Sequence, residues 1–75
     1  MNTVRRTRES LGLSQREFAE RLHIAQSLVG NVELGKLRPW PKLRKGIARV
    51  LGVPYAQLFN PDGSVIEVED DGAGK

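Results

Sequence analysis

Three polar side chains stand close together in the stretch "IAQSLVGNVE", where they have no evident core to join. Gln26 and Ser27 are adjacent, and Asn31 follows Ser27 by four residues, so a helix would bring all three toward one face. The amide of glutamine or asparagine sets a donor beside an acceptor, which matches the major-groove edge of adenine. These residue types therefore indicate hydrogen bonding to base edges, provided that the surrounding elements expose them.

The sequence offers few groups for other chemistry. It contains no cysteine and a single histidine, so neither a disulfide nor a zinc cluster is expected. It has no plausible pair of nucleophile and general base, and we expect no catalytic residue, no metal and no cofactor. No apolar run approaches the roughly 18 residues of a membrane span, and no signal-peptide core follows the N-terminus. We therefore expect a cytoplasmic protein that has no membrane partner.

Charge is distributed unevenly along the chain. Residues 1–60 hold eleven lysines and arginines against four glutamates, whereas residues 61–75 hold five acidic side chains and one lysine. A basic globule suggests a polyanionic partner, although ordinary solubility charge would explain the same counts. We expect one domain at residues 1–60, followed by an acidic tail at residues 61–75. The tail would contain at most a brief strand at residues 65–68 and otherwise be disordered.

Caps and breakers divide the domain into five short helices. Asn2 or Thr3 can begin a first helix that ends near Leu11, and "SQRE" is a capping box that opens a second helix at Ser14. A third helix spans about residues 26–34, a fourth begins at Pro41 and ends at Gly52, and a last short one follows Pro54. This order of elements predicts a compact all-α fold.

Apolar residues recur at helical spacing in these segments, and we expect them to form the core. They are Val4 and Leu11, then Phe18, Ala19 and Leu22, then Leu28, Val29 and Val32, then Leu43, Ile47, Val50 and Leu51, then Leu58 and Phe59. Trp40 is expected to cover the fourth helix as a lid. This core leaves the polar face of the third helix free.

The second and third helices are joined by about three residues, which is helix-turn-helix geometry. In such a pair the first helix crosses the DNA backbone, and the second can enter a major groove about 12 Å wide. Val29 and Val32 would anchor the third helix on the core, and Gln26, Ser27 and Asn31 would then face outward.

The run "GLSQREFAERL…VE.GK..P…IARVLGV" resembles the lambda-repressor-like family, the Cro/repressor (XRE) type of helix-turn-helix protein. The similarity covers roughly residues 4–59. It implies a five-helix domain whose third helix reads the major groove of double-stranded DNA, usually as a homodimer on a palindromic operator.

The resemblance also assigns roles to individual residues. Gln26, Ser27 and Asn31 match the base-reading positions, and Gln15 matches a phosphate-binding glutamine at the start of the second helix. Lys36 and Arg38 lie in the loop that meets the far phosphate backbone. Arg8 and Glu33 match a structural ion pair, in which Arg8 would also touch a phosphate.

Several residues depart from the pattern of the family. His23 stands where a left-handed glycine is usual, and Ala25 replaces a side-chain cap, each at a cost of about 1 kcal/mol. Gly30 weakens the third helix by about 1 kcal/mol but would let it sit deep in the groove. Leu28 would touch a thymine methyl or a partner subunit. Pro41, Arg44 and Lys45 occupy positions of the fourth helix that are frequently apolar.

We therefore expect a sequence-specific transcription regulator, most commonly a repressor for a lone domain, that associates with the nucleoid when bound. The alternative is an antitoxin-like or adaptor module that keeps the fold without specific DNA binding. A weak homodimer would form through Tyr55, Leu58 and Phe59, or through a strand at residues 65–68.

Overall fold

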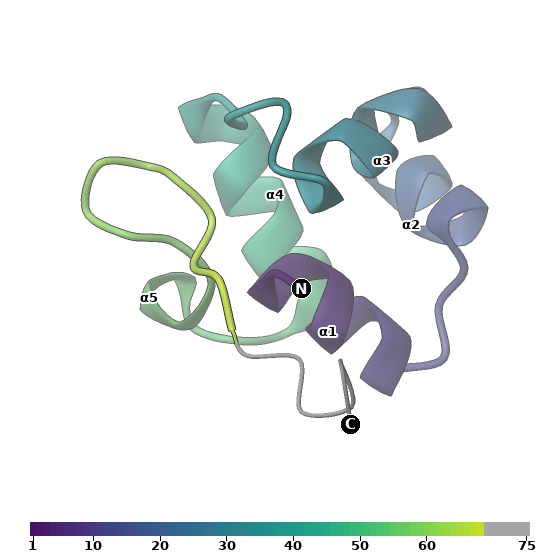
Figure 1. Cartoon of the computed structure of the whole chain (residues 1–75). Coiled ribbons are helices and arrows are strands. Elements are labelled where there is room, and N and C mark those ends of the chain that lie inside the picture. Colours follow the sequence, from purple (N-terminus) through teal and green to yellow (C-terminus); the bar gives the residue numbers. More distant parts are fainter. Residues whose placement is uncertain (69–75) are drawn as a thin grey trace.

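The computed structural model describes residues 1–68, and these form an all-α fold (Figure 1). The helices are α1 Thr3–Ser10, α2 Gln15–Leu22, α3 Gln26–Glu33, α4 Pro41–Leu51 and α5 Tyr55–Leu58. The expected all-α class and the five helices are confirmed, and the observed bounds lie close to those expected. The disorder expected for the acidic tail beyond residue 68 concerns residues outside those described.

Local caps explain why α2 begins and ends where it does. The Ser14 hydroxyl accepts a hydrogen bond from the Glu17 backbone N–H at 3.0 Å, and the Glu17 carboxylate accepts one from the Ser14 N–H at 2.9 Å. At the other end, His23 adopts a left-handed conformation with φ of 59° and ψ of 41°. This is the conformation that a glycine would adopt more readily, because a Cβ is unfavourable there.

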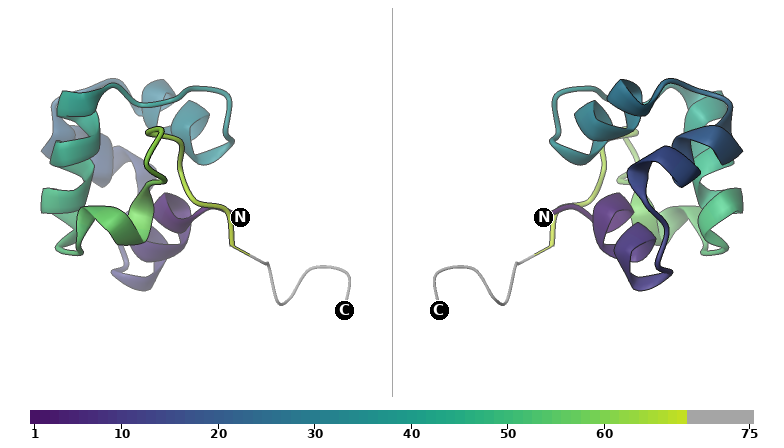
Figure 2. Two further views of the ribbon diagram at one scale, coloured as in Figure 1. Left: turned by 90° about the vertical axis from the view of Figure 1, so that its left-hand side faces the viewer. Right: turned by 90° about the vertical axis from the view of Figure 1, so that its right-hand side faces the viewer.

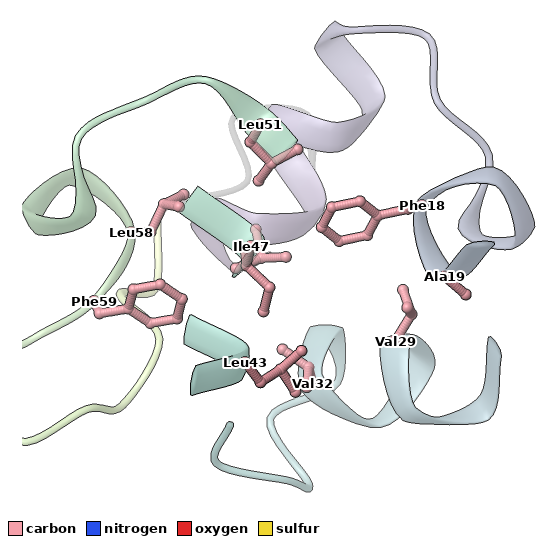
Figure 3. Packing of buried hydrophobic residues seen from close by; sticks show 10 residues of the cluster. Phe18, Ala19, Val29, Val32, Leu43, Ile47, Leu51, Leu58 and Phe59 are labelled. Atoms are coloured by element: carbon pink, nitrogen blue, oxygen red, sulfur yellow. The ribbon is translucent and has the colours of Figure 1, made fainter. Parts of the chain in front are cut away.

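Ile47 of α4 lies at the centre of the core, with side chains from α2, α3 and α5 around it (Figure 3). The buried hydrophobic residues are Val4, Phe18, Ala19, Val29, Val32, Leu43, Ile47, Leu51, Leu58 and Phe59. Two core assignments were wrong. Leu11 is 52% exposed because it follows the last turn of α1, and Trp40 is 45% exposed because it borders an open hollow between α2 and α4.

Residues 59–68 return from α5 to the start of the chain (Figures 1 and 2). The Ile66 N–H donates to the Leu58 carbonyl, and the Ile66 carbonyl accepts from the Thr3 N–H, both at 2.9 Å. Two isolated antiparallel bridges result, Phe59 with Val65 and Asn2 with Glu67, where a short strand was expected. The first residues of the expected tail therefore pack along the globule.

Asn2 connects the N-terminus to α3. Its side chain is fully buried, and its amide donates to the carbonyls of Val32 and Glu33 at 2.9 and 3.0 Å. Its Oδ1 also accepts from the Arg5 N–H, which caps α1. One asparagine thus satisfies the orphan groups at two helix ends and fixes the end of α3 relative to α1.

Candidate nucleic-acid interface

The α2–α3 pair is held at short distance by small and apolar side chains. Ala19 and Val29 face each other across the pair, and both are almost fully buried (Figure 3). The Ile24 N–H donates to the Ala19 carbonyl at 3.1 Å, which closes the turn between the helices. Val29 and Val32 attach α3 to the core, so the orientation of its remaining faces is set by packing.

The polar residues of α3 lie on its solvent side. Gln26, Ser27 and Asn31 are all exposed, and no side-chain hydrogen bond within residues 1–68 engages them. Ala25 precedes the helix without a side-chain cap, so the first N–H groups of α3 have no side-chain partner there. Leu28 is only partly buried, because it lies at the edge of the packed face.

Beneath this surface, Arg8 and Glu33 form a bidentate ion pair. The Arg8 Nε and Nη2 donate to the two carboxylate oxygens of Glu33 at 2.6 and 3.0 Å, and Nη1 donates to the Leu13 carbonyl at 2.6 Å. The side chains are 8% and 2% exposed. The hydrogen bond to Glu33 is the main reason that the pKa of Arg8 is raised above its ordinary value.

Gln15 completes the cluster from the start of α2. Its Nε2 donates to the Glu33 Oε1 at 3.1 Å, so Glu33 accepts from both α1 and α2. A hollow of about 410 Å³ opens at this point, lined by Arg5, Arg8, Gln15, Gly30, Glu33 and Leu34. Gly30 has no side chain to fill this hollow. A Cβ added at Gly30 would point into it and would have one neighbouring atom within 4 Å, the Gln15 Nε2 at 4.0 Å.

The loop between α3 and α4 carries the two other expected phosphate contacts. Lys36 is exposed, and the backbone N–H groups of Lys36 and Leu37 donate to the Asn31 carbonyl at 2.9 and 3.2 Å. Arg38 leans toward the turn after α5, with its Nη2 4.0 Å from Asp62 Oδ2. The loop is therefore bonded to α3 at one end and to a later turn at the other.

Three residues at or behind this surface have roles that the sequence did not predict. Asn2 fixes the C-terminal end of α3, Arg44 bonds the α3–α4 loop from α4, and Leu34 leaves an apolar side chain 65% exposed at the end of α3. Arg44 carried a signal, because it is a charged residue at a position that is often apolar. The contacts of Asn2 span about thirty residues of sequence, and no local pattern reveals them.

The described residues carry no feature of two other site classes. No helix within residues 1–68 is long and apolar enough to cross a membrane. The same residues contain no group of three or more histidine, cysteine, aspartate or glutamate side chains placed to hold a metal ion.

Comparison with protein families gives a match to the family described as Helix-turn-helix over residues 4–58. Comparison with curated proteins and with solved structures gives no match. The family match covers α1 to α5 and includes the α2–α3 pair. The chain belongs to the helix-turn-helix family of the lambda-repressor/Cro (XRE) type, and it contains a DNA-binding domain of the transcription-regulator kind.

Proposed function

We propose that this protein is a sequence-specific transcriptional repressor that reads an operator in double-stranded DNA with α3. The single observation that carries the proposal is the exposed polar face of α3 on a basic helix-turn-helix domain. Gln26, Ser27 and Asn31 present donors and acceptors outward, and the amides match the donor–acceptor pattern of adenine. Occupying a promoter is sufficient for repression, since it requires no contact with polymerase.

Phosphate contacts would supply the affinity. Lys36 is exposed. Gln15 and the N-terminal N–H groups of α2 would bind a phosphate on the near strand. Arg8 would act there chiefly through Glu33, because its side chain is 8% exposed and donates to Glu33 and Leu13.

We propose that the repressor binds a palindromic operator as a homodimer that is weak in solution. Two-fold symmetry would place the two copies of α3 one DNA turn, about 34 Å, apart. Three residues near the end of the domain, Tyr55, Leu58 and Phe59, were expected in the dimer interface. Leu58 and Phe59 are buried in the core, so only Tyr55, which is 38% exposed, remains available to contact a partner subunit. Residues 65–68, the other expected interface, already pair with residues 1–3 and 58–59 of the same chain.

One observation favours the alternative of a protein-interaction module. Leu34 exposes an apolar side chain at the end of α3, beside the hollow at Gly30. An adaptor or antitoxin-like protein would use such a residue to bind a partner protein.

Selection of bound duplexes from random DNA, followed by gel shift on the enriched site, tests the proposal. We expect one enriched motif with two-fold symmetry and salt-sensitive binding to it. A folded protein that enriches no motif would contradict specific reading. If the same protein also showed no salt-sensitive DNA binding, the interaction module would be the better description.

A further inference from the structure

Two arginines, Arg38 of the α3–α4 loop and Arg44 of α4, reach the same turn at residues 60–64. The Arg38 Nη1 donates to the Asp62 carbonyl at 3.4 Å, and its Nη2 lies 4.0 Å from the Asp62 carboxylate. Arg44, from the second turn of α4, places its guanidinium against Gly63. The loop that carries Lys36 and Arg38 is therefore supported by residues that follow α5.

The turn itself is built by hydrogen bonds within residues 60–64. The Asn60 N–H donates to the Ser64 carbonyl at 2.8 Å, and Asp62 Oδ1 accepts from the Ser64 N–H and hydroxyl at 2.9 and 2.6 Å. These hydrogen bonds from Ser64 lower the pKa of the Asp62 carboxyl. A bridge between Phe59 and Val65 closes the base of the turn. The turn is thus a defined element against which other side chains can rest.

Gly63 provides the place where Arg44 rests. It is buried, its φ is +90°, and an added Cβ would lie 2.7 Å from Arg44 Nη1 and 2.9 Å from Cζ. Real Cβ atoms do not approach other atoms so closely, so the guanidinium occupies the space that a side chain at position 63 would need. A side chain at position 63 would therefore displace the Arg44 guanidinium from this place.

Arg44 uses its donors to join three segments. Its Nη1 donates to the Pro39 carbonyl at 2.7 Å, and its Nε donates to the Tyr55 hydroxyl at 2.5 Å. Pro39 is fully buried and directly follows Arg38. Arg44 therefore fixes the end of the loop to α5 and to the turn at Gly63.

We propose that Arg44, seated on Gly63, is a positioning residue that holds the α3–α4 loop so that Lys36 and Arg38 can bind DNA phosphates. This inference rests on the proposed function. The turn at residues 60–64 lies beyond residue 58, where the family match ends. The support for the loop thus comes from a segment outside the matched region.

Weaker DNA binding after substitution of Arg44 could arise from the lost positive charge alone, because any lost cation weakens DNA binding. The experiment must therefore separate this charge effect from the positioning of the loop. Lys45 provides the matched control: it neighbours Arg44 on α4, is exposed, and makes no ion pair or side-chain hydrogen bond within residues 1–68. Arg44→Met and Lys45→Met each remove one positive charge, but only the first removes the contacts to Pro39 and Tyr55.

Amide hydrogen exchange of the free, full-length protein is the first test. We expect Arg44→Met to speed exchange at the Lys36 and Leu37 N–H groups about 10-fold, because their bonds to the Asn31 carbonyl open more often when the loop is released. Lys45→Met should leave both unchanged. Equal exchange in the two variants would overturn the proposal.

DNA binding in a double-mutant cycle is the second test, with a mixed-sequence duplex as the probe and at temperatures where all variants are folded. Arg44→Met should weaken binding about 5- to 10-fold in the natural loop. The loss should shrink to that of Lys45→Met when Lys36 and Arg38 are both alanine. An undiminished loss in that background would overturn the positioning role, since Arg44 would then act on DNA independently of the loop.

Milder substitutions guard against a variant that fails to fold. Tyr55→Phe removes only the hydroxyl that accepts from Arg44, and Arg44→Lys keeps the charge with fewer donors in a different geometry. Both should show smaller changes of the same kind. If the unaltered chain bound no DNA while Arg44→Met still released the loop, the proposed function would fall and the contact between loop and turn would stand.

Discussion

Glu33 is a carboxylate buried close to the surface that we expect to face phosphates. Its charge is compensated by Arg8, which donates two hydrogen bonds to it, and the neutral amide of Gln15 donates a third. Because the Glu33 side chain is only 2% exposed, the carboxylate depends on these partners instead of water. The pair thus ties α1 to α3 and limits the negative potential of this face.

Removing either member of the pair should destabilise the fold strongly. Arg8→Met leaves Glu33 buried and uncompensated, and we expect a loss of about 3 kcal/mol in the free energy of unfolding. The double variant Arg8→Met/Glu33→Leu should lose less, since it removes both charges. Urea denaturation followed by circular dichroism measures both values. A double variant that is as unstable as Arg8→Met alone, or less stable, would contradict the ion-pair explanation.

Gln26 is the residue on which the proposed base readout depends most. We expect Gln26→Ala to cost about 1–3 kcal/mol on the selected operator and little on random DNA, because base contacts carry the specificity. Lys36→Ala serves as the control, since it should weaken binding to both DNAs alike. Titrations of each variant with both duplexes measure the difference. Equal losses for Gln26→Ala on the two DNAs would remove Gln26 from the base-reading set.

At the scale of the element, the residues of α3 give this helix little intrinsic stability. It has no side-chain cap at Ala25 and contains Gly30, whose surroundings would accept a Cβ without a clash. The helix is therefore held by Val29 and Val32 in the core and by Asn2 at its end. Tertiary contacts, more than helix propensity, maintain α3.

Gly30→Ala separates the needs of folding from those of binding. The free energy of unfolding should rise by about 1 kcal/mol, because alanine favours a helix interior. Affinity for the operator should fall, because the added methyl narrows the hollow between α3 and Gln15 that DNA would approach. Thermal unfolding and DNA titration of the same variant measure the two effects. A more stable variant with unchanged affinity would show that DNA does not approach α3 closely here.

The start of α2 predicts a response to acid. Hydrogen bonds from Ser14 lower the pKa of the Glu17 carboxyl, so the folded state favours the charged form. This contribution is present above the unfolded pKa, about 4, and is lost as the pH falls through the lower folded value. Glu17→Gln can keep the capping box without titrating. Its melting temperature should therefore fall less steeply than that of the natural chain between neutral pH and pH 3, and parallel curves would contradict this origin.

The elements that were predictable from the sequence are those with local causes. The capping box at Ser14 and Glu17 and the glycine after α4 depend on neighbours within a few positions, whereas the left-handed conformation at His23 was expected from the resemblance to the family. Trp40 was misplaced because its exposure depends on where α4 lies relative to α2, which no local pattern encodes. The return of residues 61–68 to α1 was missed for the same reason, since its partners lie about sixty residues earlier.

For the candidate site too, the sequence predicted the residues but not the contacts between side chains of different elements. Helical spacing and the family pattern pointed to the polar face of α3 and to Arg8 with Glu33. The engagement of Gln15 with Glu33, and of Arg38 with Asp62, required coordinates, because each joins side chains from different elements.

At the scale of the whole molecule, charge should govern affinity. If each subunit makes about four charged phosphate contacts, the logarithm of a dimer's binding constant should fall with the logarithm of salt concentration with a slope of about −7. A monomer should give about half that slope. Fluorescence anisotropy over a range of salt concentrations measures it, with analytical ultracentrifugation reporting the number of subunits. A slope near zero would mean that phosphates contribute little.

The meeting of the two ends of the described fold has a consequence for engineering. The Val68 N–H donates to the Met1 carbonyl at 2.9 Å, beside the bridge between Asn2 and Glu67. A chain shortened to residues 1–68 would therefore have its two ends side by side, and a short peptide could join them at a small entropic cost. The domain is therefore suited to backbone cyclisation, or to circular permutation with new ends opened at the exposed Gly12, and either format would keep the covalent backbone of α3 intact.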